Sequence, residues 1–228
     1  MMLLHPVLIL SFFSGGLTNV VDHFHRTCGQ FFANGNSPTI LSGPQYIQIC
    51  QSFEGKYYYA TLYDTKNKIP VYSAYRFKRN RCPRKEKKWC IEPQLDDKTK
   101  GHNMALESEG QYGHNQALSV DYKYSGYHKG HLAPVYHANS EEFAAATFTL
   151  TNAAPQHCSF NQGPWRKTEK HVAQILTSEC PVPYKAFIVT GVVPGDIKIK
   201  GRVTVPRGST KDIKWWAEEG ERIGNDRS

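Results

Sequence analysis

Two short segments hold the residue types that could carry acid–base or metal chemistry. The first contains His128, Lys129 and His131, and the second contains Asn161 and Glu169. An imidazole can take a proton from water near neutral pH, and an adjacent ammonium can bind a phosphate oxygen. An asparagine carbonyl is a hard oxygen ligand of the kind that Mg²⁺ accepts while it keeps several waters. These residue types are therefore suited to water activation beside a bound phosphate.

The spacing between Asn161 and Glu169 is compatible with two roles at one metal. Eight residues of helix, about two turns or ~12 Å, separate them. At that distance Glu169 reaches a metal-bound water more easily than the metal itself. Taken singly, each residue has an ordinary explanation, since a histidine is more often a surface or core residue and a helix-start asparagine is more often an N-cap. The functional interpretation depends on the joint pattern.

The joint pattern resembles that of the DNA/RNA non-specific endonuclease family, whose members share a ββα-metal (His-Me finger) site. The family's first signature, Asp-Arg-Gly-His, corresponds to residues 128–131 (His-Lys-Gly-His), which Leu-Ala-Pro follows. The second signature, Asn-x-x-Pro-Gln and then Asn-Gln-x-x-Trp, corresponds to residues 152–156 and 161–165, ahead of Glu169. Residues 189–191 match the family's strand that ends in Thr-Gly. Residues 147–156, the N-terminal segment and the cysteines are most similar to a vertebrate subgroup of the family.

The resemblance implies a role for each site residue. His131 would accept a proton from the attacking water, and Asn161 would be the one direct protein ligand of Mg²⁺ (or Mn²⁺). Glu169 would orient a metal-bound water, and Asn152 would hold the framework of the site or contact the phosphate. Cleavage would leave 5′-phosphate ends.

Two positions of the first signature depart from the family. His128 replaces its aspartate, and Lys129 replaces its arginine. Lysine keeps the positive charge but lacks the planar fork that grips a phosphate through two hydrogen bonds. If the missing carboxylate orients the motif, its loss lowers activity.

A formal charge of +8 favours acidic partners such as nucleic acid, heparin-like polymers or anionic membrane, although a charge that only aids solubility explains it about equally well. Much of the excess lies in residues 78–88. Together with Arg76, His128 and Lys129, this basic segment is the candidate to bind the phosphate backbone of DNA and RNA. Such contacts carry no base preference.

The N-terminus and the cysteines favour secretion. Residues 1–20 are expected to be a signal peptide, because an apolar run that is too short to span a bilayer leads into Ser14 and two glycines. Six cysteines behind such a segment predict three disulfides, with the pairing open among about fifteen arrangements. Cys82 and Cys90 bracket much of the basic segment and could close it into a loop. A structural zinc site is less favoured, because no CxxC pair is present.

The expected fold is α+β: a mixed, mainly antiparallel sheet with the ββα-metal motif and packed helices. Aromatic and β-branched residues predict a hairpin, and alternation and apolar runs predict further strands. The amphipathic pattern over 165–176 predicts a helix. The strands are expected at residues 56–63, 69–77, 147–151, 186–190 and 201–205. A lead-in at 21–42 would precede the nuclease domain at 43–228, whose end, without a strand pattern after Trp216, is expected to be truncated or divergent.

These features predict a secreted, Mg²⁺-dependent endonuclease that hydrolyses DNA and RNA with little base preference and has no membrane span. One alternative is a weak or inactive secreted protein of the same fold that binds nucleic acid or other polyanions. It predicts salt-sensitive binding without cleavage. A purely structural, disulfide-linked extracellular protein predicts neither binding nor cleavage.

Overall fold

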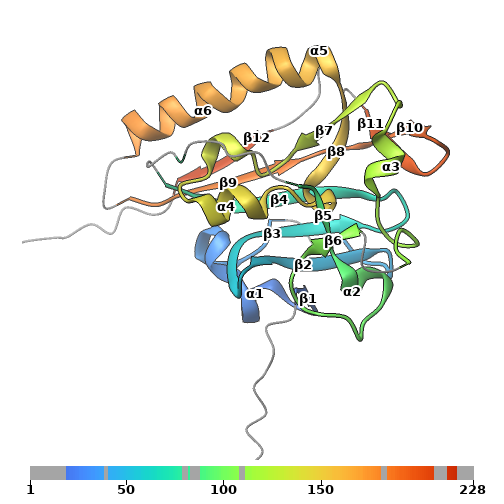
Figure 1. Cartoon of the computed structure of the whole chain (residues 1–228). Helices are drawn as coiled ribbons and strands as arrows, with labels where there is room; N and C mark the ends of the chain where they lie inside the picture. Colours follow the sequence, from blue (N-terminus) through green and yellow to red (C-terminus); the bar gives the residue numbers. More distant parts are fainter. Residues whose placement is uncertain are drawn as a thin grey trace, which may run out of the picture.

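A six-stranded antiparallel sheet forms the centre of the molecule (Figure 1). The computed structural model describes residues 19–38, 41–78, 82, 88–107, 111–180, 184–207 and 215–219. In spatial order the strands are β1 (Val20–Val21), β2 (Tyr46–Phe53), β3 (Lys56–Asp64), β4 (Ile69–Phe77), β9 (Ala186–Gly191) and β12 (Trp215–Glu219). The predicted α+β fold with a mainly antiparallel sheet is confirmed.

The predicted hairpin of β3 and β4 lies at the middle of this sheet. Leu62 pairs with Tyr72, and the Asp64 carboxylate accepts hydrogen bonds from the main-chain nitrogens of Lys66 and Asn67 (2.9 and 3.0 Å) in the turn. Alternating side chains of the hairpin reach opposite faces of the sheet. Tyr59 and Tyr75 are fully buried on the face that α4 (Glu141–Ala146) covers.

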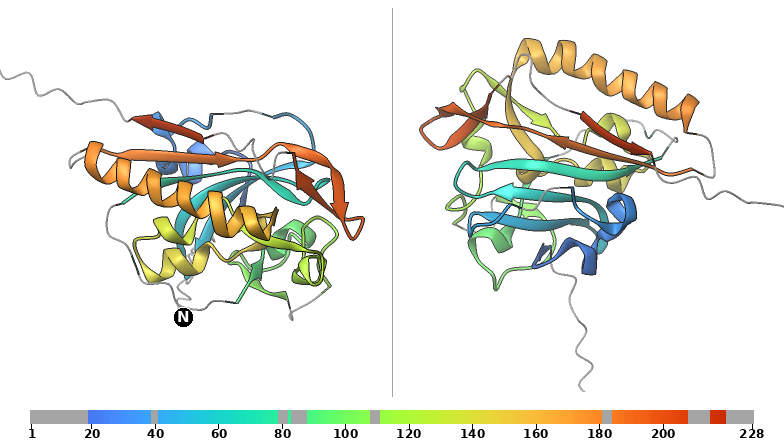
Figure 2. Two further views of the ribbon diagram at one scale, coloured as in Figure 1. Left: turned by 90° about the horizontal axis from the view of Figure 1, so that it is seen from above. Right: turned by 180° about the vertical axis from the view of Figure 1, so that it is seen from behind.

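Of the segment expected as a lead-in (21–42), residues 21–38 pack as part of the domain. β1 pairs with β2, and Phe24, Phe31 and Phe32 are buried against the sheet face that Tyr72 and Ala74 share. These aromatic residues come from α1 (Phe24–Thr27), η1 (Gly29–Phe31) and the turn to η2 (Ala33–Gly35). A disulfide between Cys28 and Cys50 ties the segment to β2. Figure 2 shows these short helices on the side of the sheet away from α6.

Three two-stranded sheets and further short helices surround the main sheet. The sheets are β5 (Cys90–Ile91) with β6 (Ala105–Leu106), β7 (Tyr127–His131) with β8 (Ala153–His157), and β10 (Pro194–Ile199) with β11 (Val203–Pro206). The short helices are α2 (Pro93–Asp96), α3 (Ser119–Tyr122), η4 (Val135–His137) and η5 (Leu150–Asn152). No helix in the described ranges is both long enough and apolar enough to cross a membrane.

The ββα motif consists of β7, β8 and the helical segment that follows β8. That segment runs through α5 (Cys158–Phe160), the π-helical turn η6 (Asn161–Trp165) and α6 (Arg166–Glu179). The predicted helix over 165–176 is confirmed. In Figure 1, α6 crosses the top of the molecule above β7, β8 and β9.

Three expectations need correction. Residues 147–151 form an isolated bridge at Thr149 and then η5, because the Asn152 side chain bonds the Thr147 carbonyl (3.0 Å) and turns the chain. β12 pairs with β9 along Trp215–Glu219, so a strand does occur where no strand pattern was visible. No disulfide joins Cys82 to Cys90 in the described part of the chain. The expected signal peptide lies almost wholly outside the described residues.

Candidate functional site

A cleft of about 1230 Å³ lies beside the ββα motif and gathers five of the residues that the sequence singles out. They are His128, Lys129, His131, Asn161 and Glu169. Three come from β7, and the other two come from the helical segment of η6 and α6. β7 and the helical segment therefore bring these five residues to one cleft.

The pairing of β7 with β8 explains why a glycine precedes His131. His128 lies opposite Gln156, whose side chain is almost fully buried. A Cβ on Gly130 would lie 2.2 Å from the Gln156 Cδ atom, closer than any van der Waals contact allows. Gly130 thus admits the Gln156 side chain against the strand that presents His131.

Asn152 supports the framework from behind the cleft. Its Oδ1 atom accepts hydrogen bonds from the Ala133 main-chain nitrogen and from the Ser73 hydroxyl (both 2.9 Å). Its amide nitrogen donates to the carbonyls of Ala133 and Thr147 (both 3.0 Å). Asn152 is fully buried, and it links the chain just after His131 to β4 and to Thr147, which precedes η5.

Aromatic rings hold the His131 imidazole. Its centroid lies 4.8 Å from the Trp89 ring and 4.9 Å from the Phe148 ring, which meets it edge-on at 84°. The Nε2 atom of His131 is buried. The sequence gives no signal for Trp89, because a single tryptophan beside a run of lysines carries no motif.

Lys129 lies over the same tryptophan. Its ammonium is 5.2 Å from the Trp89 centroid and 5.8 Å from the Tyr122 centroid, and it donates to the Ser119 hydroxyl (3.0 Å). Burial lowers the pKa of Lys129, and the nearby Glu107 carboxylate opposes this shift. Trp89 therefore lies between the candidate base and the candidate phosphate-binding cation.

His128, which replaces the family's aspartate, faces the candidate metal ligand. The Asn161 amide nitrogen lies 3.4 Å from His128 Nδ1. Asn161 opens the π-helical turn η6, in which Pro164 has no N–H to donate. The wide turn sets Asn161 at the head of the helix that also carries Glu169.

His137 is a site residue that sequence reasoning missed. Its Nε2 donates to the main-chain oxygen of Glu169 (2.7 Å), and its Nδ1 accepts a hydrogen bond from the Tyr75 hydroxyl (2.6 Å). Burial lowers the pKa of His137 to about 4, so the imidazole is neutral at physiological pH. The only sequence signal is a histidine six residues after His131.

The structure does not bring Arg76 to the cleft. Tyr75 and Phe77 lie on the α4 side of β4, so alternation places Arg76 on the opposite face. Most of the basic segment (79–81 and 83–87) lies outside the described residues. Cys82 and Trp89, on either side of residues 83–87, both line the cleft.

Comparisons with known proteins identify relatives of the chain. The model of the DNA/RNA non-specific endonuclease family matches residues 41–226. The endonuclease domain-containing 1 protein of Homo sapiens is 37% identical over 185 residues, which cover 78% of this chain and 37% of that protein. The Mus musculus protein of the same name is 35% identical over 185 residues, or 78% of this chain and 36% of that protein. The chain thus spans little more than a third of these relatives.

A crystal structure of the EndoG/EndoGI complex aligns with a TM-score of 0.48 and 20% identity, over 75% of this chain and 74% of that chain.

Proposed function

Because this chain belongs to the DNA/RNA non-specific endonuclease family, we propose that it is a metal-dependent endonuclease that hydrolyses phosphodiester bonds of DNA and RNA with little base preference. The observation that carries the proposal is the meeting of His131, Asn161 and Glu169 in one cleft. The first and the last of these residues, His131 and Glu169, are 38 positions apart in the sequence, and the ββα motif brings them together.

The donor set fits one hard divalent cation. The Asn161 amide nitrogen is the atom next to His128, which leaves the amide oxygen as the ligand. The described residues contain no group of three or more His, Cys, Asp or Glu side chains that could hold a metal. Asn161 would therefore hold Mg²⁺ or Mn²⁺ together with water and phosphate oxygens. When bound, the ion supplies charge stabilisation at the phosphate and at the leaving oxygen.

His131 acts as the general base. Because Nε2 is buried, we assign proton acceptance to Nδ1. The attacking water gives its proton to Nδ1 and its oxygen bonds to phosphorus, while the bond from phosphorus to the 3′ oxygen breaks. The leaving 3′ oxygen takes a proton from solvent water, which gives a 3′-hydroxyl and a 5′-phosphate. Trp89 and Phe148 hold the imidazole plane during this step. Glu169 orients a water from the first turn of α6.

Cationic side chains of the cleft bind the phosphate backbone. Lys129 acts from β7, and Lys123 and Arg166 line the same cleft. Phosphate contacts do not depend on the identity of the base, which accounts for the low base preference. DNA and RNA share the phosphate group, so the same contacts can bind both. His128 contributes from beside Asn161.

We also propose that the protein is secreted. Its signal peptide would end before Asn19 rather than at residue 20, because Asn19 is buried and bonded to Glu92 and Val20 pairs with Ile49 of β2. Support comes from the apolar N-terminal segment and from the Cys28–Cys50 disulfide, because such bonds form and persist in oxidising compartments.

A weakly active binder of nucleic acid is the second candidate, and one observation favours it. The Lys129 ammonium is engaged by Ser119 and two aromatic rings, so it is less available to a phosphate than a free cation would be. This candidate predicts salt-sensitive binding with an intact substrate.

The test is cleavage of supercoiled plasmid and of single-stranded RNA by the purified chain, in Mg²⁺ or Mn²⁺, with and without EDTA. We expect nicked plasmid and shortened RNA that EDTA abolishes, and 5′-phosphate ends. An Asn161→Ala variant should lose metal-dependent cleavage. Intact substrates together with a mobility shift would establish the binder instead, and intact substrates without a shift would contradict both candidates.

A further inference from the structure

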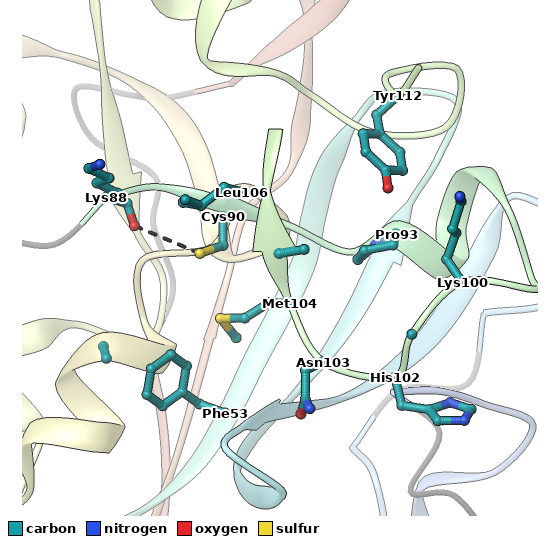
Figure 3. A pocket seen from close by; sticks show the side chains of 13 residues that line it. Phe53, Lys88, Cys90, Pro93, Lys100, His102, Asn103, Met104, Leu106 and Tyr112 are labelled. Atoms are coloured by element: carbon teal, nitrogen blue, oxygen red, sulfur yellow. Dashed lines mark hydrogen bonds between the residues drawn. The ribbon is translucent and has the colours of Figure 1, made fainter. Parts of the chain in front are cut away.

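A second cavity, of about 660 Å³ (Figure 3), adjoins the segment of residues 88–90, which also contributes to the cleft. Lys88 and Cys90 line this cavity, whereas Trp89 between them lines the cleft. Alternate side chains of one extended segment therefore form part of the wall of both spaces. A ligand that passes over this segment would reach from one space to the other.

The chemistry of the second cavity favours an anion. Among the residues that the structure describes, its lining includes Lys88, Lys100 and His102 but no aspartate or glutamate, in a chain with 20 acidic residues. In Figure 3 the two lysines stand on opposite sides of the cavity. The Asn103 Oδ1 atom accepts a hydrogen bond from the Ser52 hydroxyl (3.0 Å), so its amide nitrogen is left as a donor.

The same cavity also has an apolar surface. Phe53, Met104, Leu106 and Tyr112 line it, and the Tyr112 ring points inward in Figure 3. Its volume is within the range of about 300–1,000 Å³ that is typical of sites for small ligands. The two lysines suit the phosphate groups of a ligand, and the Tyr112 ring suits a flat group such as a base.

We propose that this cavity is a subsite for an unpaired nucleotide of the nucleic-acid substrate, at a distance from the phosphate that is cut. Tyr112 and Phe53 contact the base, and Lys88 and Lys100 contact the flanking phosphates. A base within a duplex is stacked and paired, so the subsite selects single-stranded segments. This inference rests on the proposed function, because the cleft must hold the rest of the strand.

The experiment measures binding rather than cleavage, so that activity cannot obscure it. The full chain carrying His131→Ala is titrated against a fluorescein-labelled single-stranded oligonucleotide and against the matching duplex, by anisotropy in Mg²⁺. On that background, Lys88→Ala with Lys100→Ala and Tyr112→Ala are compared with Lys66→Ala. Lys66 is an exposed lysine in the β3–β4 turn and serves as the matched control. Melting curves show that each variant is folded.

For the single strand, the double-lysine variant should bind roughly tenfold more weakly, and the slope of log K against log salt should fall by about 0.7 for each lysine. Tyr112→Ala should weaken single-strand binding by roughly fivefold or more, whereas Tyr112→Phe should retain it. The dissociation constant for the duplex should change less than twofold in the cavity variants. In Lys66→Ala, the dissociation constants for single strand and duplex should both change less than twofold.

Each contrary result points to a different error. If the parent protein does not bind nucleic acid and the wild-type chain does not cut it, the proposed function fails and the subsite fails with it. If the wild-type chain cuts nucleic acid but the cavity variants bind single strands like Lys66→Ala, the subsite alone is overturned. Equal losses for single strand and duplex would overturn the selection of an unpaired nucleotide.

Discussion

His137 donates a hydrogen bond from Nε2 to the main-chain oxygen of Glu169, at 2.7 Å. The donor belongs to η4, just after the segment that contains His131, and the acceptor belongs to the helix that follows Asn161. Tyr75 of the central sheet completes the chain of contacts through its hydroxyl. One buried imidazole therefore sets the distance between the candidate base and the helix that carries the candidate metal ligand.

Replacing His137 with phenylalanine should reduce both stability and activity. The variant leaves the Glu169 carbonyl and the Tyr75 hydroxyl without their partner, at a cost of about 1–3 kcal/mol in the free energy of unfolding. Urea denaturation and the initial rate of plasmid nicking measure the two effects. Tyr75→Phe is the matched control, because it removes one hydrogen bond and leaves the bond to Glu169. Equal nicking rates for His137→Phe and wild type would show that the bridge does not position the site.

Glu92 should make stability depend on pH. Burial raises its pKa from 4.5 to about 8, and a hydrogen bond from Asn19 (2.9 Å) partly opposes the shift. The folded chain therefore keeps a proton that the unfolded chain releases, so this contribution is fully present below pH 4.5 and is lost as pH rises through about 8. Glu92→Gln should remove this decrease in the free energy of unfolding with rising pH. Urea denaturation at pH 5 and pH 8.5 checks it, and identical pH dependence in both proteins would contradict it.

Gly130→Ala should distort the strand that presents His131. The added Cβ would lie 2.2 Å from the buried Gln156 side chain, and such overpacking costs about 1–3 kcal/mol. The nicking rate should fall with stability. Gly163→Ala provides the control, since nothing lies within 4 Å of a Cβ at that position and its melting temperature should not fall. A Gly130→Ala protein as stable as the control would disprove the close packing.

Restoring the family's carboxylate with His128→Asp should strengthen metal binding. The position faces Asn161, and an aspartate there adds negative charge beside the proposed ligand. The Mg²⁺ concentration for half-maximal nicking should fall several-fold. His128→Asn, which has similar volume but no charge, separates the charge from the change of shape. If both variants need the same Mg²⁺ concentration for half-maximal nicking, a negative charge at this position does not affect metal binding.

The sequence predicts the candidate catalytic and metal-binding residues better than it predicts the residues that pack around them. His131, Asn161 and Glu169 follow from residue type and motif spacing, and the hairpin of β3 and β4 follows from alternation. Trp89 and Tyr75 could not be predicted, because their contacts with His131 and His137 join positions 42 and 62 residues apart.

Local patterns also misled where a buried side chain overrides them. Alternation over residues 147–151 predicts a strand, but the four hydrogen bonds of Asn152 bend this segment into η5. Arg76 has the charge expected of a phosphate contact, yet the alternation of β4 places it away from the cleft. The role of any one charge depends on which face of the sheet it occupies.

The central claim is that His131 is the general base, and the initial rate of plasmid nicking by His131→Ala in saturating Mg²⁺ tests it most directly. His171→Ala is the matched control, because His171 is an exposed histidine on α6. We expect His131→Ala to be slower than wild type by about 10²–10⁴-fold and His171→Ala to keep the wild-type rate. Wild-type and His131→Ala proteins that nick plasmid at the same rate would contradict the account.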